Sequence, residues 1–192
     1  MRKLVLFVHV SLDGFVAGPK GEMNWIHIDD EIFDYVGKRI EKTDAALYGR
    51  ITYQMMEDYW PTAADKPDAS KHDIEHSKWY SQAGKIILSK TIQENDKPNT
   101  KVISNDLKTE INSIKQSEGS EILIFGSPSA AHSLMELDLI DGYWLFVNPV
   151  LIGKGIPLFK NIGTKQNLKM TGCKVFSSGV ICTQYEKEEP MI

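Results

Sequence analysis

Two stretches of this chain share one plan, in which an apolar strand runs into a glycine and then into the start of a helix. The first is Ala45-Ala46-Leu47-Tyr48-Gly49-Arg50-Ile51-Thr52 and the second is Ile122-Leu123-Ile124-Phe125-Gly126-Ser127-Pro128-Ser129. A helix start carries unpaired N–H groups and the positive end of the helix dipole, so it attracts phosphate. Glycine has no Cβ and lets the backbone approach an anion closely. Two such junctions predict a site that holds both ends of a dinucleotide.

The rest of the chain alternates strands with helices. Periodicity and breakers predict strands at residues 3–10, 45–48, 85–89, 101–104, 121–125 and 142–147, with helices at about 29–42, 71–82, 106–116 and 127–137. A further helix is expected to begin near Arg50 and end before Trp60-Pro61, and residues 168–185 read as an antiparallel hairpin. This order predicts an α/β fold, a mostly parallel sheet with antiparallel strands at its C-terminal end. We expect residues 1–192 to form a single domain.

Composition narrows the partners of the chain. With 22 basic and 26 acidic residues, its formal net charge is −4, so no basic face for nucleic acid is expected. No apolar run approaches the roughly 20 residues that cross a bilayer, and the start does not have the form of a signal peptide. We therefore expect a cytoplasmic protein with a small-molecule ligand, and neither nucleic acid nor membrane as partner.

Three short segments are candidate phosphate contacts. After Gly49, the guanidinium of Arg50 and the hydroxyl of Thr52 match a pyrophosphate, although a tight turn with a surface arginine would look the same. Ser127 as N-cap with Pro128 at the first helical position is a strong helix start in purely structural terms. Residues 89–91, Ser-Lys-Thr, follow a strand and suit a further phosphate such as that on the ribose of NADP, or simply a solvated strand end.

Other chemistry has weaker support. The GxGxxG and P-loop patterns are absent from the sequence. His72 and His76 stand four apart on a predicted helix, but no third ligand is evident, so a charged, solvated helix face is favoured over a metal site. His9 and His132 are assigned to the core. Of the acidic residues near position 30, one is needed as a helix cap and a second is available to help protonate a substrate.

Together these segments resemble the dihydrofolate-reductase-like superfamily. The resemblance rests on residues 11–18 (SLDGFVAG), 47–53 (LYGRITY), 126–127 (GS), 139–143 (LIDGY), 148–155 (NPVLIGKG) and 157–159 (PLF). These motifs are most similar to the C-terminal reductase domain of the bifunctional riboflavin-biosynthesis deaminase/reductase and its stand-alone bacterial relatives. Gly126-Ser127 replaces the paired glycines of dihydrofolate reductases and Asn24-Trp25 replaces their Pro-Trp, which argues against dihydrofolate itself as the substrate.

The resemblance implies a three-layer fold, a homodimer, and NADPH bound across the C-terminal strand ends. Its implied cofactor contacts are Ala17, Gly18, Gly49, Arg50, Thr52, Ser89, Lys90, Thr91, Gly126, Ser127, Pro128, Ser129 and Ala130. Asp13 and Trp25 would line the substrate side. Counting from the tryptophan, Asp30 falls where dihydrofolate reductases keep their substrate-binding carboxylate, and it is the predicted catalytic residue, although Asp29 leaves the register open.

Two functional hypotheses follow. The first is an NADPH-dependent reductase that transfers hydride to a small heterocyclic (pterin or aminopyrimidine-like) or carbonyl substrate. The alternative is a non-catalytic protein that binds or senses NADP on the same fold. A metal-dependent hydrolase built on His72 and His76 is a third and weaker idea, and no metal site is predicted.

Overall fold

The computed structural model describes residues 1–92 and 97–188, and its centre is an eight-stranded sheet in the order β5-β4-β3-β6-β1-β7-β10-β9. The strands from β5 to β7 are parallel, whereas β10 runs antiparallel to both β7 and β9. Their bounds are β1 Leu4–Ser11, β3 Ala45–Gly49, β4 Gly84–Leu88, β5 Thr100–Ile103, β6 Ile122–Phe125, β7 Gly142–Asn148, β9 Leu168–Val175 and β10 Ile181–Lys187. The predicted parallel sheet and C-terminal antiparallel hairpin are confirmed.

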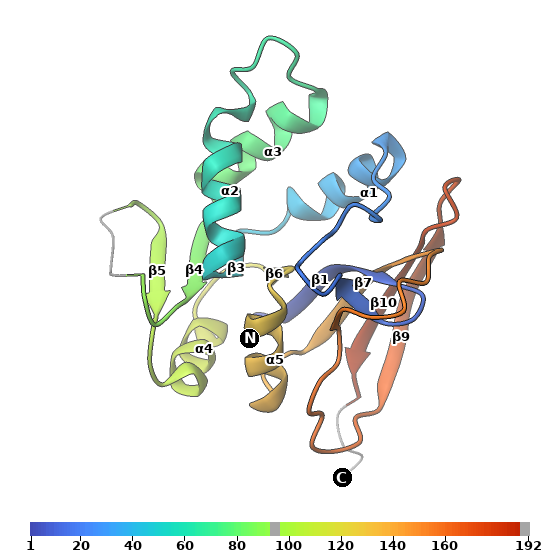
Figure 1. Cartoon of the computed structure of the whole chain (residues 1–192). Coiled ribbons are helices and arrows are strands. Elements are labelled where there is room, and N and C mark those ends of the chain that lie inside the picture. The colour runs from blue at the N-terminus through green and yellow to red at the C-terminus, as the bar shows by residue number, and fades with distance from the viewer. Residues whose placement is uncertain (93–96, 189–192) are drawn as a thin grey trace.

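Helices cover both faces of this sheet, which gives the three layers (Figure 1). One face carries α1 (Asp30–Ile40), α2 (Arg50–Ala63) and α3 (Lys71–Gln82), and the other carries α4 (Leu107–Gln116) and α5 (Pro128–Glu136). Each face has its own apolar core. Ile32 of α1 and Trp79 of α3 belong to one core, while Ile111 of α4 and Leu134 of α5 belong to the other.

Strand β3 shows why the central strands read as continuous apolar runs. Successive side chains of a strand point to opposite faces. Ala45 and Leu47 therefore enter the core beneath α4 and α5, and Ala46 and Tyr48 enter the core on the other face. All five residues of β3 are buried, as expected for a parallel strand covered on both sides.

The chain leaves two neighbouring strands toward opposite faces. Strand β3 pairs with β6 in parallel, with Ala45 opposite Ile122. The helix after β3 is α2, on one face, and the helix after β6 is α5, on the other (Figure 1). In open α/β sheets a crevice forms outside the carboxyl ends of strands at such a switch point, and ligands bind there. The two predicted strand–glycine–helix junctions are the walls of this crevice.

Helix α2 differs from expectation at its end. It continues through Pro61 to Ala63 rather than ending before Trp60-Pro61. Proline removes one helical N–H, but in the last turn little helix follows that could be disrupted. Tertiary contacts hold this turn, because the Ser77 hydroxyl donates to the Trp60 carbonyl at 2.7 Å. The Trp60 ring also lies 4.0 Å from that of His76. Packing against α3 therefore overrides the local breaker.

The predicted solvated face around His72 and His76 is wrong. His72 stacks on Phe33 of α1 with ring centroids 3.8 Å apart, and His76 is only 7% exposed between α2 and α3. Both rings serve as packing surfaces, a tertiary role that helical spacing does not reveal. Within residues 1–92 and 97–188, no three histidine, cysteine or acidic side chains cluster in a way that could hold a metal ion.

A second, two-stranded sheet was not predicted. It pairs β2 (Phe15–Ala17) with β8 (Ile156–Pro157), segments that are distant in sequence and too short to show a strand period. It fastens the loop after β1 to the segment after β7. Among the described helices, none has both the length and the apolar character that crossing a bilayer requires.

Candidate active site

The two glycine junctions touch one another at the carboxyl edge of the sheet. Gly49 is the N-cap of α2, and a Cβ built on it would overlap the Ser127 hydroxyl oxygen and lie 3.3 Å from Ser127 Cβ. Ala130 Cβ would be 3.5 Å away. The backbone angle φ of −81° at position 49 would suit any residue, so it does not explain the glycine. The close approach of Ser127 does, because it leaves no room for a Cβ. The starts of α2 and α5 consequently open into one crevice.

The second junction has an unusual backbone. Gly126 and Ser127 both lie in the left-handed region, at φ 50° and 55°, and the Gly126 N–H donates to the Phe7 carbonyl at 3.2 Å. Ser127 is the N-cap of α5 and Pro128 is its first residue, as predicted, but the Ser127 side chain makes no cap hydrogen bond. The left-handed turn carries its hydroxyl away from the first helical N–H groups. Ser129 and Ala130 in the first turn of α5 thus keep N–H groups without intrahelical acceptors.

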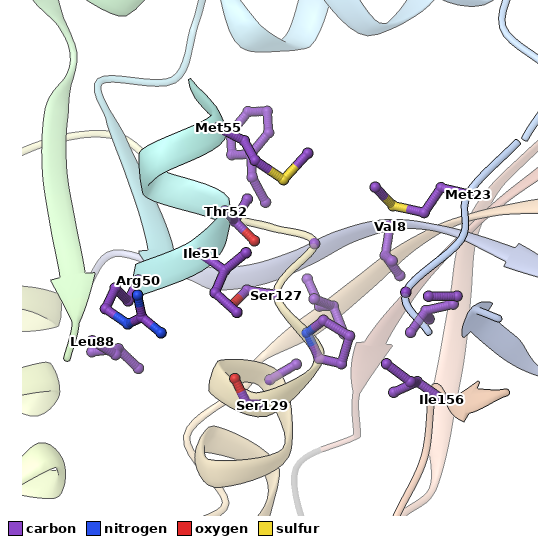
Figure 2. A pocket seen from close by; sticks show the side chains of 18 of the residues that line it. Val8, Met23, Arg50, Ile51, Thr52, Met55, Leu88, Ser127, Ser129 and Ile156 are labelled. Carbon is purple, nitrogen blue, oxygen red and sulfur yellow. The ribbon is translucent and has the colours of Figure 1, made fainter. Parts of the chain in front are cut away.

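A cavity of about 590 Å³ opens in front of these helix starts. Figure 2 shows the start of α2 with Arg50 and Thr52 close to Ser127 and Ser129, and Met23 and Ile156 across the opening. Its walls are largely apolar, and Ile51 and Met55 project into it although they are 64% and 51% exposed. Volume and lining are those of a small-molecule site, for which about 300–1,000 Å³ is typical.

The charged groups on these walls are cationic. Arg50 and Lys90 line the cavity, and no carboxylate is among the lining side chains of the described residues. Arg50 bonds only to the neutral Gln54, at 3.2 Å, and Lys90 forms no ion pair with any residue in the described part of the chain. Two cations that have no acidic partner within residues 1–92 and 97–188, beside two helix starts, form a strongly anion-attracting surface.

A second cavity, of about 660 Å³, adjoins the first along Leu88, Ser89, Lys90 and Ser129. It extends to the start of α4, which has Asp106 as its N-cap. The Asp106 side chain makes no cap hydrogen bond, because the residue is left-handed at φ 44°. The two cavities together provide an elongated space whose shared wall carries Lys90.

Most residues predicted to hold the cofactor lie on these walls. The first cavity is lined by Ala17, Arg50, Thr52, Ser89, Lys90, Thr91, Gly126, Ser127, Pro128 and Ser129, and the second by Ala130. Gly49 lies behind Ser127, and Gly18 follows the lining residue Ala17. The Ser89 hydroxyl accepts from the N–H groups of Thr91 and Ile92, at 3.1 and 2.9 Å, which shapes the turn that presents Lys90.

Strand β2, which ends at Ala17, is held in place by its pairing with β8. A Cβ at Gly155 would overlap the Ala17 carbonyl oxygen, so the two short strands approach more closely than any side chain would permit. The Gly18 N–H donates to the Glu22 carbonyl at 2.8 Å and closes the following turn. This turn positions Met23 at the cavity.

The three residues predicted on the substrate side do not line the cavity. Asp13 ties two loops together by accepting from the Ser11 hydroxyl at 2.6 Å and the Gly153 N–H at 2.8 Å. These hydrogen bonds lower the pKa of Asp13. Trp25 donates to the Glu22 carbonyl at 3.2 Å. Asp30 is exposed as the first residue of α1, and its catalytic role stays a prediction without a place on the wall.

The exposed position of Asp30 follows from the role of its neighbour Asp29 at the start of α1. Asp29 is the N-cap of α1 and accepts from the Ile32 N–H at 2.9 Å. The acidic cluster is therefore an ordinary helix start, with Asp30 turned to solvent.

Among the described wall residues that sequence reasoning missed, His9 is the one that can titrate. It was assigned to the core, but it is half-buried near the end of β1 and lines the cavity. Burial lowers the pKa of His9 to about 4. The sequence did contain a signal that His9 lies at a binding site. It is a polar side chain in an apolar strand, close to the carboxyl end of that strand, where parallel sheets bind ligands. The other histidine assigned to the core, His132, is half-buried on α5, and its Nε2 lies 3.0 Å from the Pro157 carbonyl oxygen.

The three layers, the strand order and the crevice between β3 and β6 define a dihydrofolate-reductase-like α/β protein. Residues 2–182 match the family model described as the RibD C-terminal domain, so the chain belongs to that family. It is 33% identical over 189 residues to the uncharacterized protein YyaP of Bacillus subtilis (strain 168), covering 96% of this chain and 94% of that protein.

Solved structures support the same fold. A pyrimidine reductase-like protein from Corynebacterium diphtheriae superposes with a TM-score of 0.68 at 18% identity, covering 98% of this chain and 92% of that one. Dihydrofolate reductase from Enterococcus faecalis, solved in complex with NADP(H) and RAB-propyl, superposes with a TM-score of 0.62 at 13% identity, covering 97% of each chain.

Proposed function

We propose that this protein is an NADPH-dependent reductase of a small heterocyclic (pterin or aminopyrimidine-like) or carbonyl substrate. One observation carries the proposal: the starts of α2 and α5 meet at a single cavity whose charged wall groups, Arg50 and Lys90, are cations that form no ion pair with any described residue. The family and the names of the relatives, a pyrimidine reductase-like protein and an NADP(H)-bound reductase, agree with it.

The residues present fit the parts of NADPH. The pyrophosphate matches Arg50, Thr52 and the N–H groups at the start of α5, which supply a cation, a hydroxyl and backbone donors. Lys90, on the wall that both cavities share, is the candidate for the ribose phosphate. When bound, NADPH supplies the hydride.

The chain itself would bind, orient and exclude water. The apolar side chains of Ile51, Met55 and Met23 offer flat contact to a ring and keep solvent from the reacting faces. Because no carboxylate lines the cavity within the described residues, we assign the proton to a water molecule rather than to Asp30. Catalysis would then depend on positioning.

Binding of the coenzyme tests the proposal directly. Arg50→Ala should weaken NADPH binding in calorimetry by roughly 5- to 150-fold, the loss expected for one charge-assisted contact of about 1–3 kcal/mol. Lys78→Ala is the matched control, because Lys78 is an exposed cation on α3 that does not line the cavity. Equal effects of the two substitutions, or no NADPH binding by the unaltered protein, would refute the assignment.

A second candidate is a protein that binds or senses NADP without turnover. The observation that favours it is that no acidic side chain of the described residues lines the first cavity, where the substrate would lie. The absorbance of NADPH at 340 nm, followed with pterin, pyrimidine and quinone compounds, separates the two candidates. Tight binding without any oxidation across such a panel would favour the second.

A further inference from the structure

His9 lies at the point where β1 loses a neighbour. On one side its partner in register is Phe146 of β7, and the two rings stack with centroids 5.0 Å apart. On the other side the last register pair joins Phe7 to Phe125, after which β6 turns away at Gly126. The imidazole is therefore held on one side by an aromatic ring and faces the cavity on the side that β6 has left.

Asn148, at the end of β7, fixes which atoms of the imidazole can donate. Its Oδ1 accepts from the backbone N–H of His27 at 2.8 Å, and its Nδ2 donates to the Phe146 carbonyl at 3.0 Å. A backbone N–H can only donate and a carbonyl can only accept, so both contacts require the same orientation of the amide. Asn148 is 1% exposed and has no room to reorient freely.

This orientation determines the tautomer of His9. Asn148 Nδ2 lies 3.3 Å from His9 Nδ1, and because it is a donor, Nδ1 must accept. The proton of the neutral ring then resides on Nε2. No described residue bonds to Nε2, and it is not among the buried side-chain atoms left without a partner. A fixed N–H donor is thus available at the cavity.

We propose that His9 is a specificity-determining residue whose Nε2–H donates to an acceptor atom of the substrate, a carbonyl oxygen or an unprotonated ring nitrogen. This inference rests on the proposed function for the identity of the cavity as a substrate site. It selects neutral, acceptor-bearing rings over protonated ones, because the cavity walls of the described residues offer a donor and two cations but no carboxylate.

The role is recognition rather than proton transfer. Burial holds the pKa of His9 at about 4, and the donor of Asn148 facing Nδ1 opposes a second ring proton. Near neutral pH the ring is therefore uncharged and keeps its Nε2 proton. A buried donor aimed at an acceptor discriminates strongly, since a ligand lacking that acceptor leaves the donor unpaired.

The test uses two flat bicyclic probes, quinazoline-2,4-dione, which has carbonyl acceptors, and indole, which has no acceptor atom. Binding is measured by calorimetry to the protein alone and again in the presence of NADP⁺, which cannot reduce either probe. His9→Phe keeps a stacking ring and removes the donor, whereas His9→Gln keeps a donor and loses the ring. We expect the dione to bind roughly 10-fold more weakly to His9→Phe, with indole binding unchanged and with part of the loss of dione binding restored in His9→Gln.

A second readout does not need a ligand. Long-range ¹H–¹⁵N correlation spectra of the free protein at pH 7 should show the Nε2–H tautomer for the signal that disappears in His9→Phe. An Nδ1–H tautomer, or dione affinity unaffected by His9→Phe, would overturn the inference. NADPH affinity reports separately on the proposed function: if NADPH fails to bind while the tautomer and dione results hold, the reductase proposal fails and the donor role stands.

Discussion

The contact between the two glycine junctions predicts energetic coupling between Gly49 and Ser127. In Gly49→Ala the new methyl group would occupy the position of the Ser127 hydroxyl and approach Ser127 Cβ at 3.3 Å and Ala130 Cβ at 3.5 Å. The backbone at position 49 has φ −81°, so no conformational strain is added. The whole effect must come from overpacking.

The expected cost follows from which atoms can move. Ser127 is 7% exposed, and rotating its hydroxyl away requires displacing packed neighbours, so Gly49→Ala should destabilise by about 1–3 kcal/mol. Ser127→Ala removes the overlapping oxygen, which makes no cap hydrogen bond, and should cost little by itself. In the double variant only the tight carbon contacts remain. The coupling free energy should therefore be about 1–2 kcal/mol.

Urea unfolding of the wild type, both single variants and the double variant measures this coupling, with unchanged m-values as the condition for comparison. Gly37→Ala is the control, because a Cβ there meets nothing within 4 Å inside helix α1, and it should stabilise by about 0.5–1 kcal/mol. Strictly additive effects of Gly49→Ala and Ser127→Ala would show that the two turns are not in contact, and the shared anion site would fall with them.

Three further results are expected. Gly155→Ala should displace the Ala17 carbonyl and weaken NADPH binding, whereas Gly163→Ala, where a Cβ meets nothing within 4 Å, should not; equal affinities would refute the coupling of β8 to the site. Lys90→Ala should reduce the preference for NADPH over NADH in calorimetry roughly 10-fold, and an unchanged ratio would remove Lys90 from the ribose phosphate. Burial lowers the pKa values of His9 and His76 to about 4 and about 3, so the unfolded chain binds more protons below pH 6.5. The free energy of unfolding should therefore decrease as the pH is lowered, by about 2 kcal/mol for each of the two histidines between neutral pH and pH 5. In urea unfolding, His76→Phe should lose about half of this pH dependence.

Local pattern was enough to find the elements but not their tertiary uses. The apolar run of β3 and the glycine that ends it were recognised because strand period and turn chemistry are properties of neighbouring residues. The predicted end of α2 before Trp60-Pro61 was wrong, because contacts with α3 outweigh the local effect of Pro61 as a helix breaker. The predicted solvated face around His72 and His76 was wrong for the same reason, since the rings that cover them come from other helices.

The candidate site also has one part that local pattern predicted and one part that it did not. Its cofactor side was predicted from contiguous motifs, and most of those residues line the cavities. Its substrate side depends on which strand ends are neighbours, and there the expectation placed Asp30 where the structure has His9. The pairing of His9 with Asn148 joins positions 139 residues apart, a separation that no local pattern bridges.

The sequence by itself thus determined that this chain alternates strands and helices and carries two glycine junctions able to receive an anion, because each depends on a few adjacent residues. Only the tertiary structure decided that the junctions meet. It inserts β6 between β3 and β1, so that the starts of α2 and α5 face one cavity, and that order results from the burial of apolar side chains on both faces of the sheet.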